Sequence, residues 1–178
     1  MKVLVVGGGG REHAIVWKLS QSPKVSEIIC APGNGGIAKY ARCFPDVKAT
    51  DLDGQCRLAV DEKVDFAVVA PDDPLSLGLV DRLAELGIPA FGPTASAAII
   101  ESSKAFSKSL MQKYGIPTAR FKTFTDVEPA IAYVREEGAP IVVKADGLAL
   151  GKGVVVCQTV EEAENAVKSM MSDGVFGK

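Results

Sequence analysis

Short apolar runs rich in valine and isoleucine alternate along this chain with longer amphipathic stretches. Continuous short apolar runs are typical of strands buried on both faces of a parallel sheet. The expected strands are Val3–Val6, Glu27–Cys30, Phe66–Ala70, Pro89–Phe91, Phe121–Phe124, Ile141–Lys144 and Gly153–Cys157. The expected helices are Glu12–Gln21, Leu52–Glu62, Pro74–Leu86, Lys104–Tyr114, Val127–Glu137 and Val160–Met171. This order predicts an α/β fold with a doubly wound parallel sheet in the first part of the chain.

The texture of the sequence changes after this first part. From Thr94 the residues are small, polar and helical in pattern, and the stretch ends at Gly115-Ile116-Pro117. Glycine and proline in this arrangement mark a boundary. We therefore expect one domain at residues 1–115 and the start of a second at residues 116–178. The second part is short for an independent core, so we expect it to belong to a larger, truncated domain.

Charge and cysteine usage exclude several classes of function. With 20 basic and 22 acidic residues, the chain offers no broad positive field for nucleic acid or an anionic membrane. No stretch approaches the ~20 apolar residues of a membrane span. Four cysteines without a C-x-x-C pair, beside a single histidine, argue against a zinc site. Cys30 and Cys157 lie in apolar runs and are expected to be buried free thiols, which fits a reducing cytoplasm.

A glycine loop, Gly7–His13, follows the first expected strand and opens a helix. Glycines let a backbone approach an anion, helix N-terminal N–H groups then point at it, and Arg11 adds a guanidinium fork. The dinucleotide fingerprint fits poorly, because Glu12 stands where its third glycine belongs and no acid follows Cys30–Pro32. The pattern favours a phosphate monoester. Tight packing is the alternative, with Glu12 as favourable helix charge and His13 as a structural side chain.

Two further loops, Ala31–Gly36 and Ala70–Leu75, follow the next expected strands. Ligands of open α/β sheets bind outside the carboxyl ends of the strands, so the three loops are expected to face one crevice. Asp73 before Pro74 is interpreted as an N-cap. Asp72 is then free to accept hydrogen bonds from sugar hydroxyls.

A second glycine loop lies within Ile141–Val154. It resembles a Walker A loop but is one residue short, has Gly153 in place of the magnesium-binding hydroxyl, and leads into a strand. With Lys144 ending one strand and Lys152 in the loop, the pattern favours a flap over a nucleotide triphosphate. An ordinary hairpin with surface lysines is the alternative.

Six segments occur in the order found in one enzyme family: Gly7–His13, Ala31–Gly36, Phe91–Thr94, Glu101–Lys104, Gly115–Ala119 and Val142–Val154. Together they resemble the phosphoribosylamine–glycine ligases, or glycinamide ribonucleotide synthetases, over essentially the whole chain. The resemblance implies a Rossmann-like, phosphoribosylamine-binding pre-ATP-grasp domain followed by the start of an ATP-grasp domain (its small lid subdomain). It also implies de novo purine biosynthesis, in which ATP and glycine form glycyl phosphate. The amine of 5-phosphoribosylamine attacks this intermediate to give glycinamide ribonucleotide, ADP and phosphate.

The resemblance assigns residues to two binding sites. The implied ATP-binding residues are Lys104, Lys144, Asp146, Gly147, Gly151, Lys152 and Gly153. The implied phosphoribosylamine-binding residues are Gly9, Gly10, Arg11, Glu12, Asn34, Gly35 and Asp72. Asp72 stands where the family usually has glutamate, and Leu150 where it usually has alanine.

The family's Mg²⁺ (or Mn²⁺) ligands, glycine site and adenine hinge lie farther along a longer chain. We therefore expect no metal ligand and no certain catalytic residue in these residues, and no activity from them alone. The resemblance further implies a cytoplasmic enzyme, monomeric at full length, whose partners are its small-molecule substrates, without nucleic acid or membrane.

Two other interpretations stay open. Another ATP-grasp ligase, such as a biotin-dependent carboxylase subunit or a formate-using purine enzyme, would share the second glycine loop. The Gly-Gly-Arg-Glu-His sequence favours the glycine ligase. A non-catalytic nucleotide- or sugar-phosphate-binding module would lack ATP–ADP exchange and glycine-dependent phosphate release.

Overall fold

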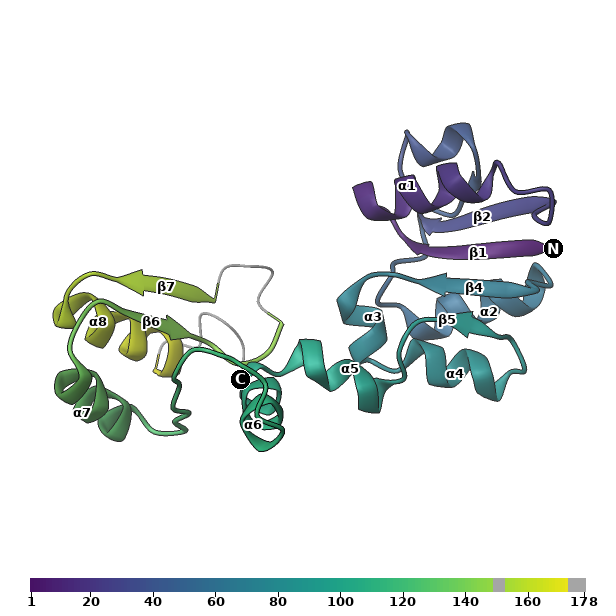
Figure 1. The fold of residues 1–178 in the computed structure, drawn as a ribbon. Coiled ribbons are helices and arrows are strands. Elements are labelled where there is room, and N and C mark those ends of the chain that lie inside the picture. The colour runs from purple at the N-terminus through teal and green to yellow at the C-terminus, as the bar shows by residue number, and fades with distance from the viewer. Residues whose placement is uncertain (149–152, 173–178) are drawn as a thin grey trace. The chain divides into compact units, whose positions relative to one another are not determined.

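The computed structural model describes residues 1–148 and 153–172. The chain forms two compact units, Met1–Ile99 and Ile100–Lys178, and helix α5 (Ala95–Ser102) runs through the division (Figure 1). This division precedes the boundary expected after residue 115. Helix α6 (Lys104–Lys113) falls in the second unit because hydrogen bonds attach its first turn to the segment after residue 144.

The first unit contains a five-stranded parallel sheet with the order β3-β2-β1-β4-β5. Its strands are β1 (Lys2–Gly7), β2 (Glu27–Pro32), β3 (Arg42–Cys43), β4 (Phe66–Val69) and β5 (Ala90–Phe91). Strand β1 lies in the centre, where Val5 is opposite Cys30 of β2 and Val68 of β4. The doubly wound α/β fold is thus confirmed. Strand β3 was not predicted, because Arg42 and Cys43 form no apolar run.

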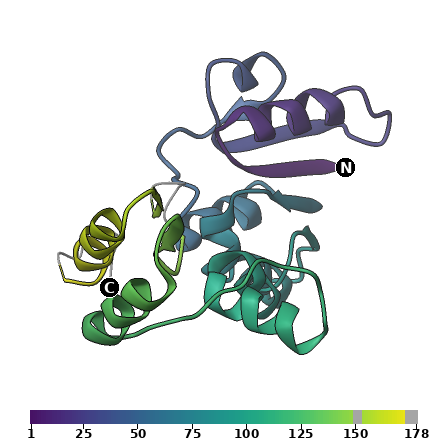
Figure 2. The ribbon, with the colours of Figure 1, turned by 60° about the vertical axis from the view of Figure 1, so that its left-hand side comes forward.

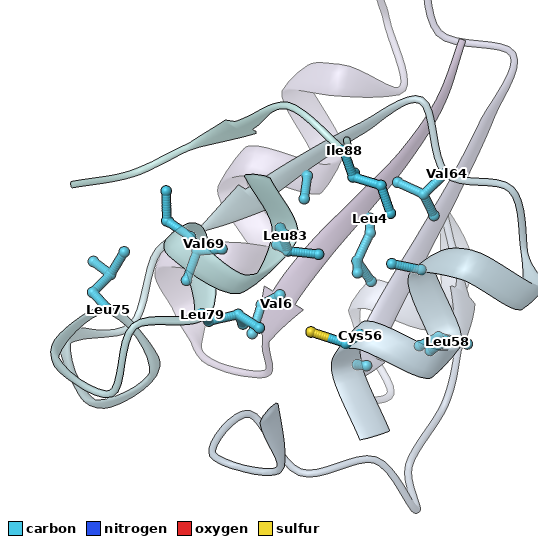
Figure 3. Close-up of a cluster of buried hydrophobic side chains, with 14 of the residues drawn as sticks. Leu4, Val6, Cys56, Leu58, Val64, Val69, Leu75, Leu79, Leu83 and Ile88 are labelled. Atoms are coloured by element: carbon cyan, nitrogen blue, oxygen red, sulfur yellow. The ribbon is translucent and has the colours of Figure 1, made fainter. Parts of the chain in front are cut away.

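Helices cover both faces of this sheet (Figures 1 and 2). Successive side chains of a strand point to opposite faces, so Val3 and Val5 pack on one side and Leu4 and Val6 on the other. The first side is covered by α1 (Gly10–Leu19) and the short helix η1 (Ile37–Lys39). The second side is covered by α2 (Leu52–Asp61), α3 (Asp72–Ser76) and α4 (Leu79–Glu85). Their apolar side chains pack with Leu4, Val6 and Val69 of the strands in the cluster of Figure 3.

The helix expected over Pro74–Leu86 is in fact two helices, α3 and α4. They are separated at Gly78, whose φ of +87° is left-handed and cannot continue a right-handed helix. Leu86, the last residue of the expected helix, is the C-cap of α4 and is 49% exposed. Asp73 is not an N-cap: α3 begins at Asp72, with Pro71 in the cap position. Gly87 follows α4 with a φ of +74°, as a helix-ending glycine should.

The second unit contains an antiparallel pair, β6 (Ile141–Lys144) and β7 (Val154–Cys157). Helices α7 (Val127–Glu137) and α8 (Val160–Met171) pack on the pair and bury Cys157 among their apolar side chains. Among the residues of this unit that the structure describes, the strand expected over Phe121–Phe124 does not form. The Phe124 ring packs instead against Tyr133 of α7, 5.3 Å between centroids.

The burial predicted for Cys30 and Cys157 is confirmed. Cys30 and Cys157 are buried free thiols, and burial raises the pKa of Cys30 to about 12. No helix within the described ranges is long and apolar enough to cross a membrane.

Ion pairs join the amino ends of β1, β2 and β3 to the end of α2. Lys2 Nζ lies 2.9 Å from Glu27 and 3.3 Å from Glu62, and Arg42 pairs with both glutamates. The hydrogen bond from Arg42, aided by Lys2, lowers the pKa of Glu62 from its ordinary value of 4.5 to about 2. A lowered pKa stabilises the folded state above the unfolded value, and this stabilisation is lost as the pH falls through the folded value.

We therefore expect Glu62→Gln to flatten the pH dependence of the free energy of unfolding between about pH 4.5 and about pH 2. Urea unfolding at a series of pH values measures this dependence. Asp46→Asn, at an exposed loop position of the same unit, is the control. An unchanged acid dependence in Glu62→Gln would show that the network does not act as described.

Candidate functional site

The loops Gly7–His13, Ala31–Gly36 and Ala70–Leu75, here called the first, second and third loops, follow β1, β2 and β4. The first and second loops leave the same edge of the sheet and are bonded to each other. Gly33 N donates to Gly7 O at 3.0 Å, and Asn34 Nδ2 donates to Gly8 O at 2.8 Å. Asn34 Oδ1 also accepts from Gly36 N at 2.8 Å and from Ile37 N at 2.9 Å. Asn34 thus holds the two loops together, and its contact with a substrate stays a prediction.

The glycines of these loops fall into two groups. An added Cβ at Gly8 would lie 2.7 Å from Gly33 O, and one at Gly33 would overlap the Cys43 side chain. Internal packing therefore requires glycine at these positions. At Gly10 and Gly35 an added Cβ would meet no atom within 4 Å, and neither residue has a left-handed φ. The protein's own packing does not require glycine there, so both positions leave room for a ligand to approach the backbone.

Arg11 brings the third loop to the first. Its Nη1 donates to Ala70 O at 2.8 Å and lies 3.6 Å from Asp72 Oδ1. The Arg11 side chain is 61% exposed, so its remaining guanidinium N–H groups are accessible. The three loops therefore meet at the carboxyl ends of β1, β2 and β4, as the sequence predicted.

Glu12 and His13 both face the loops. Glu12 is only 5% exposed, and its Oε2 accepts from Gly9 N at 2.7 Å. The His13 ring is half-buried, with its centroid 6.0 Å from that of Tyr40. An added Cβ at Gly36 would lie 2.6 Å from His13 Cε1, so the histidine packs against the second loop. These contacts support a structural role for His13.

Three of the predicted ATP-binding residues lie together in the second unit. Lys104 Nζ donates to Gly147 O at 2.7 Å. The Asp146 carboxylate accepts from the Ser103 hydroxyl at 3.0 Å and from Ala105 N at 3.1 Å. Desolvation would raise the pKa of Asp146, but these bonds and others from nearby backbone N–H groups lower it overall. The carboxylate thus fastens the N-terminus of α6 to the segment after β6.

Four predicted ATP-binding residues remain. Lys144 ends β6 opposite Val154, with an exposed side chain. Gly153 is buried, and its carbonyl accepts from Ala145 N at 2.8 Å. Gly151 and Lys152 lie outside the described residues.

Two further features bear on ligand binding. In residues 1–148 and 153–172, no group of three or more histidine, cysteine, aspartate or glutamate side chains could hold a metal ion. A cavity of about 420 Å³ lies between α2 and α4, lined by Asp53, Cys56, Arg57, Arg82, Glu85 and Leu86. No predicted site residue lines this cavity, and Arg82 already pairs with Asp53.

Known proteins match this chain along its length. Residues 1–101 match the family model described as phosphoribosylglycinamide synthetase, N domain, and residues 102–178 match the ATP-grasp (A) domain of the same synthetase. A phosphoribosylamine–glycine ligase of Xanthomonas campestris is 56% identical over 99% of this chain and 41% of its own length. One from Escherichia coli is 52% identical over 99% of the chain and 42% of its own length. The chain therefore spans about two fifths of these relatives.

Solved structures agree with the fold. The phosphoribosylamine–glycine ligase of Thermotoga maritima has a TM-score of 0.74 at 32% identity, over 99% of this chain and 42% of that one. A biotin carboxylase of Campylobacter jejuni has a TM-score of 0.78 at 20% identity, over 97% of this chain and 42% of that one, which shows the shared fold alone. The chain belongs to the phosphoribosylglycinamide synthetase family and comprises its N domain and part of its ATP-grasp domain.

Proposed function

We propose that a protein carrying this chain uses ATP to join glycine to 5-phosphoribosylamine through glycyl phosphate, in the purine pathway. It acts as a cytoplasmic monomer and releases ADP, phosphate and glycinamide ribonucleotide. The observation that carries the proposal is the meeting of three loops at one sheet edge, with open space at Gly10 and Gly35 beside the accessible Arg11 guanidinium. Membership of this family supports phosphoribosylamine as the ligand that these loops bind.

In this proposal, residues 1–115 hold phosphoribosylamine. The N-terminus of α1 has N–H groups without intrahelical partners, and together with Arg11 it binds the phosphate. Asp72 accepts from sugar hydroxyls, and Asn34 keeps the second loop against the first. The amine is left to attack the glycyl carbonyl: the new C–N bond forms as the C–O bond to phosphate breaks and the nitrogen loses a proton.

The second unit, whose residues 102–178 match the ATP-grasp domain, binds the triphosphate. Lys104 and Lys144 supply positive charge, and Asp146 positions Lys104 by accepting hydrogen bonds from Ser103 and Ala105 on either side of it. The proposed phosphate flap, Gly147–Gly153, includes residues 149–152, which lie outside the described residues. The described residues do not fit a Mg²⁺ site, since they lack a cluster of acidic ligands.

The activity is tested by joining residues 1–178 to the remaining part of the Xanthomonas campestris relative and measuring ADP formation. We expect ADP only when both glycine and phosphoribosylamine are present, and none from the 178-residue chain alone. The proposal would be contradicted if ADP formation did not depend on glycine and phosphoribosylamine, or if it required bicarbonate and biotin instead.

Lys104→Ala in the same fusion should raise the Michaelis constant for ATP at least tenfold, because a charge-assisted bond contributes about 1.5–3 kcal/mol. Lys108→Ala, one turn further along α6, is the matched control. Its ammonium donates to Thr118 Oγ1 at 2.6 Å and Ala119 O at 3.1 Å. Equal effects of the two changes would mean that Lys104 acts only on the stability of α6.

A further inference from the structure

Glu12 is a buried acidic side chain at the centre of the first loop. Family resemblance places it among the substrate contacts, yet its carboxylate faces the protein's own backbone. Oε2 accepts from Gly9 N at 2.7 Å, and an added Cβ at Gly9 would lie 2.9 Å from the same oxygen. A buried carboxylate is costly unless it is hydrogen-bonded, and this bond meets that requirement at the loop itself.

The loop is also shaped by Glu12 through packing. Gly7 has a φ of +120°, and an added Cβ there would lie 2.7 Å from Glu12 Cγ and 2.8 Å from Pro71 Cγ. The backbone at Gly7 therefore passes between the Glu12 side chain and the third loop. No bulkier residue fits at this point without displacing one of them.

The hydrogen bond also decides which N–H groups remain for a ligand. Gly9 is the N-cap of α1 and Glu12 is its third helical residue, a position from which a glutamate can bond the N-cap N–H. With the Gly9 N–H occupied, the N–H groups of Gly10, Arg11 and Glu12 are left without intrahelical partners, because the first bond within the helix is donated by His13 N to Gly9 O. Of these residues, Gly10 is the one at which an added Cβ would meet no atom within 4 Å.

We infer that Glu12 is a positioning residue, which holds the Gly7–Gly10 loop in the form that presents the Gly10 and Arg11 N–H groups to the substrate phosphate. The inference rests on the proposed function. It predicts that the acceptor oxygen matters and that the negative charge does not. Glu12→Gln keeps an acceptor of the same length, whereas Glu12→Ala removes it.

The test uses the 178-residue chain and ribose 5-phosphate, which carries the phosphate and sugar without the amine. Binding is measured by calorimetry, and protection of the Gly9 amide by hydrogen exchange. Glu12→Ala should raise the dissociation constant at least tenfold and remove the Gly9 protection. Glu12→Gln should have a dissociation constant within about threefold of that of the unchanged chain and should retain the protection of the Gly9 amide. Urea unfolding verifies that each variant is folded.

Glu162→Ala is the matched control, because Glu162 Oε2 accepts from Gln158 N at 2.7 Å near the N-terminus of α8. It should leave ribose 5-phosphate binding unchanged. Equal loss in Glu12→Gln and Glu12→Ala would overturn the inference by showing that the negative charge of Glu12 is required. Unchanged binding in Glu12→Ala would overturn it by showing a purely structural cap. Absence of binding in the unchanged chain would instead contradict the proposed function itself.

Discussion

Replacing Gly33 by alanine should destabilise the first unit by several kcal/mol. A left-handed φ of +75° costs a non-glycine residue about 1–3 kcal/mol. The added methyl would also overlap the Cys43 thiol and lie 2.9 Å from Cys43 Cβ, and such overpacking costs about 1–3 kcal/mol more. The loop cannot easily move away, because Gly33 N is bonded to Gly7 O.

Two other glycines separate these effects. Gly87 has a φ of +74° but no atom within 4 Å of an added Cβ, so Gly87→Ala measures backbone strain alone. Gly35 has neither constraint, so Gly35→Ala should leave stability unchanged. Urea unfolding followed by the fluorescence of Trp17, the one tryptophan of the chain, reports on the first unit. If Gly33→Ala is no less stable than Gly87→Ala, the Cys43 contact does not fix the loop.

Arg11→Ala should weaken ribose 5-phosphate binding by about 1.5–3 kcal/mol, the scale of a charge-assisted hydrogen bond. Because the side chain is 61% exposed, the free energy of unfolding should change little. Calorimetric titration of the 178-residue chain measures the binding. In the fusion with the Xanthomonas campestris segment, the Michaelis constant for ATP should hardly move.

Arg120→Ala is the control for this substitution. Arg120 is an arginine of the second unit, 91% exposed, with a surface ion pair of 3.6 Å to Glu137. A similar loss of binding in both variants would mean that only net charge matters. A loss of stability in Arg11→Ala without a loss of binding would make its bond to Ala70 O its main role.

Much of the fold follows from local sequence. The runs that form β1, β2 and β4 are apolar because both faces of these strands are buried. The run of β6 is buried on one face only, where Ile141 and Val143 pack against α7 and α8, and Val142 on the other face is 47% exposed. Helices α7 and α8 begin and end where their patterns predicted. Strand β3 was not predicted because it is defined only by its backbone pairing with β2, which leaves no apolar pattern in the sequence. Its Arg42 belongs to an ion-pair network instead of an apolar run. The strand predicted over Phe121–Phe124 was wrong, because aromatic side chains are as common in packing contacts as in strands, and Phe124 packs against Tyr133.

The site was predictable only as far as topology determines it. Loops after parallel strands must meet at one edge, so the association of Arg11 with Asp72 follows from the strand order. The contact between Gly33 and Cys43 has no local signal, since it depends on how two loops pack. Ser103 was missed as a partner of Asp146, although a serine directly before an expected helix is a recognisable N-cap.

The most direct test of the central claim is a titration of the ¹⁵N-labelled 178-residue chain with ribose 5-phosphate, followed by NMR. The account predicts that the amide resonances of Gly9, Gly10, Arg11 and Gly35 shift together with one dissociation constant, while those of α7 and α8 stay in place. Shifts confined to the cavity between α2 and α4, or no shifts at the three loops at millimolar ligand, would contradict it.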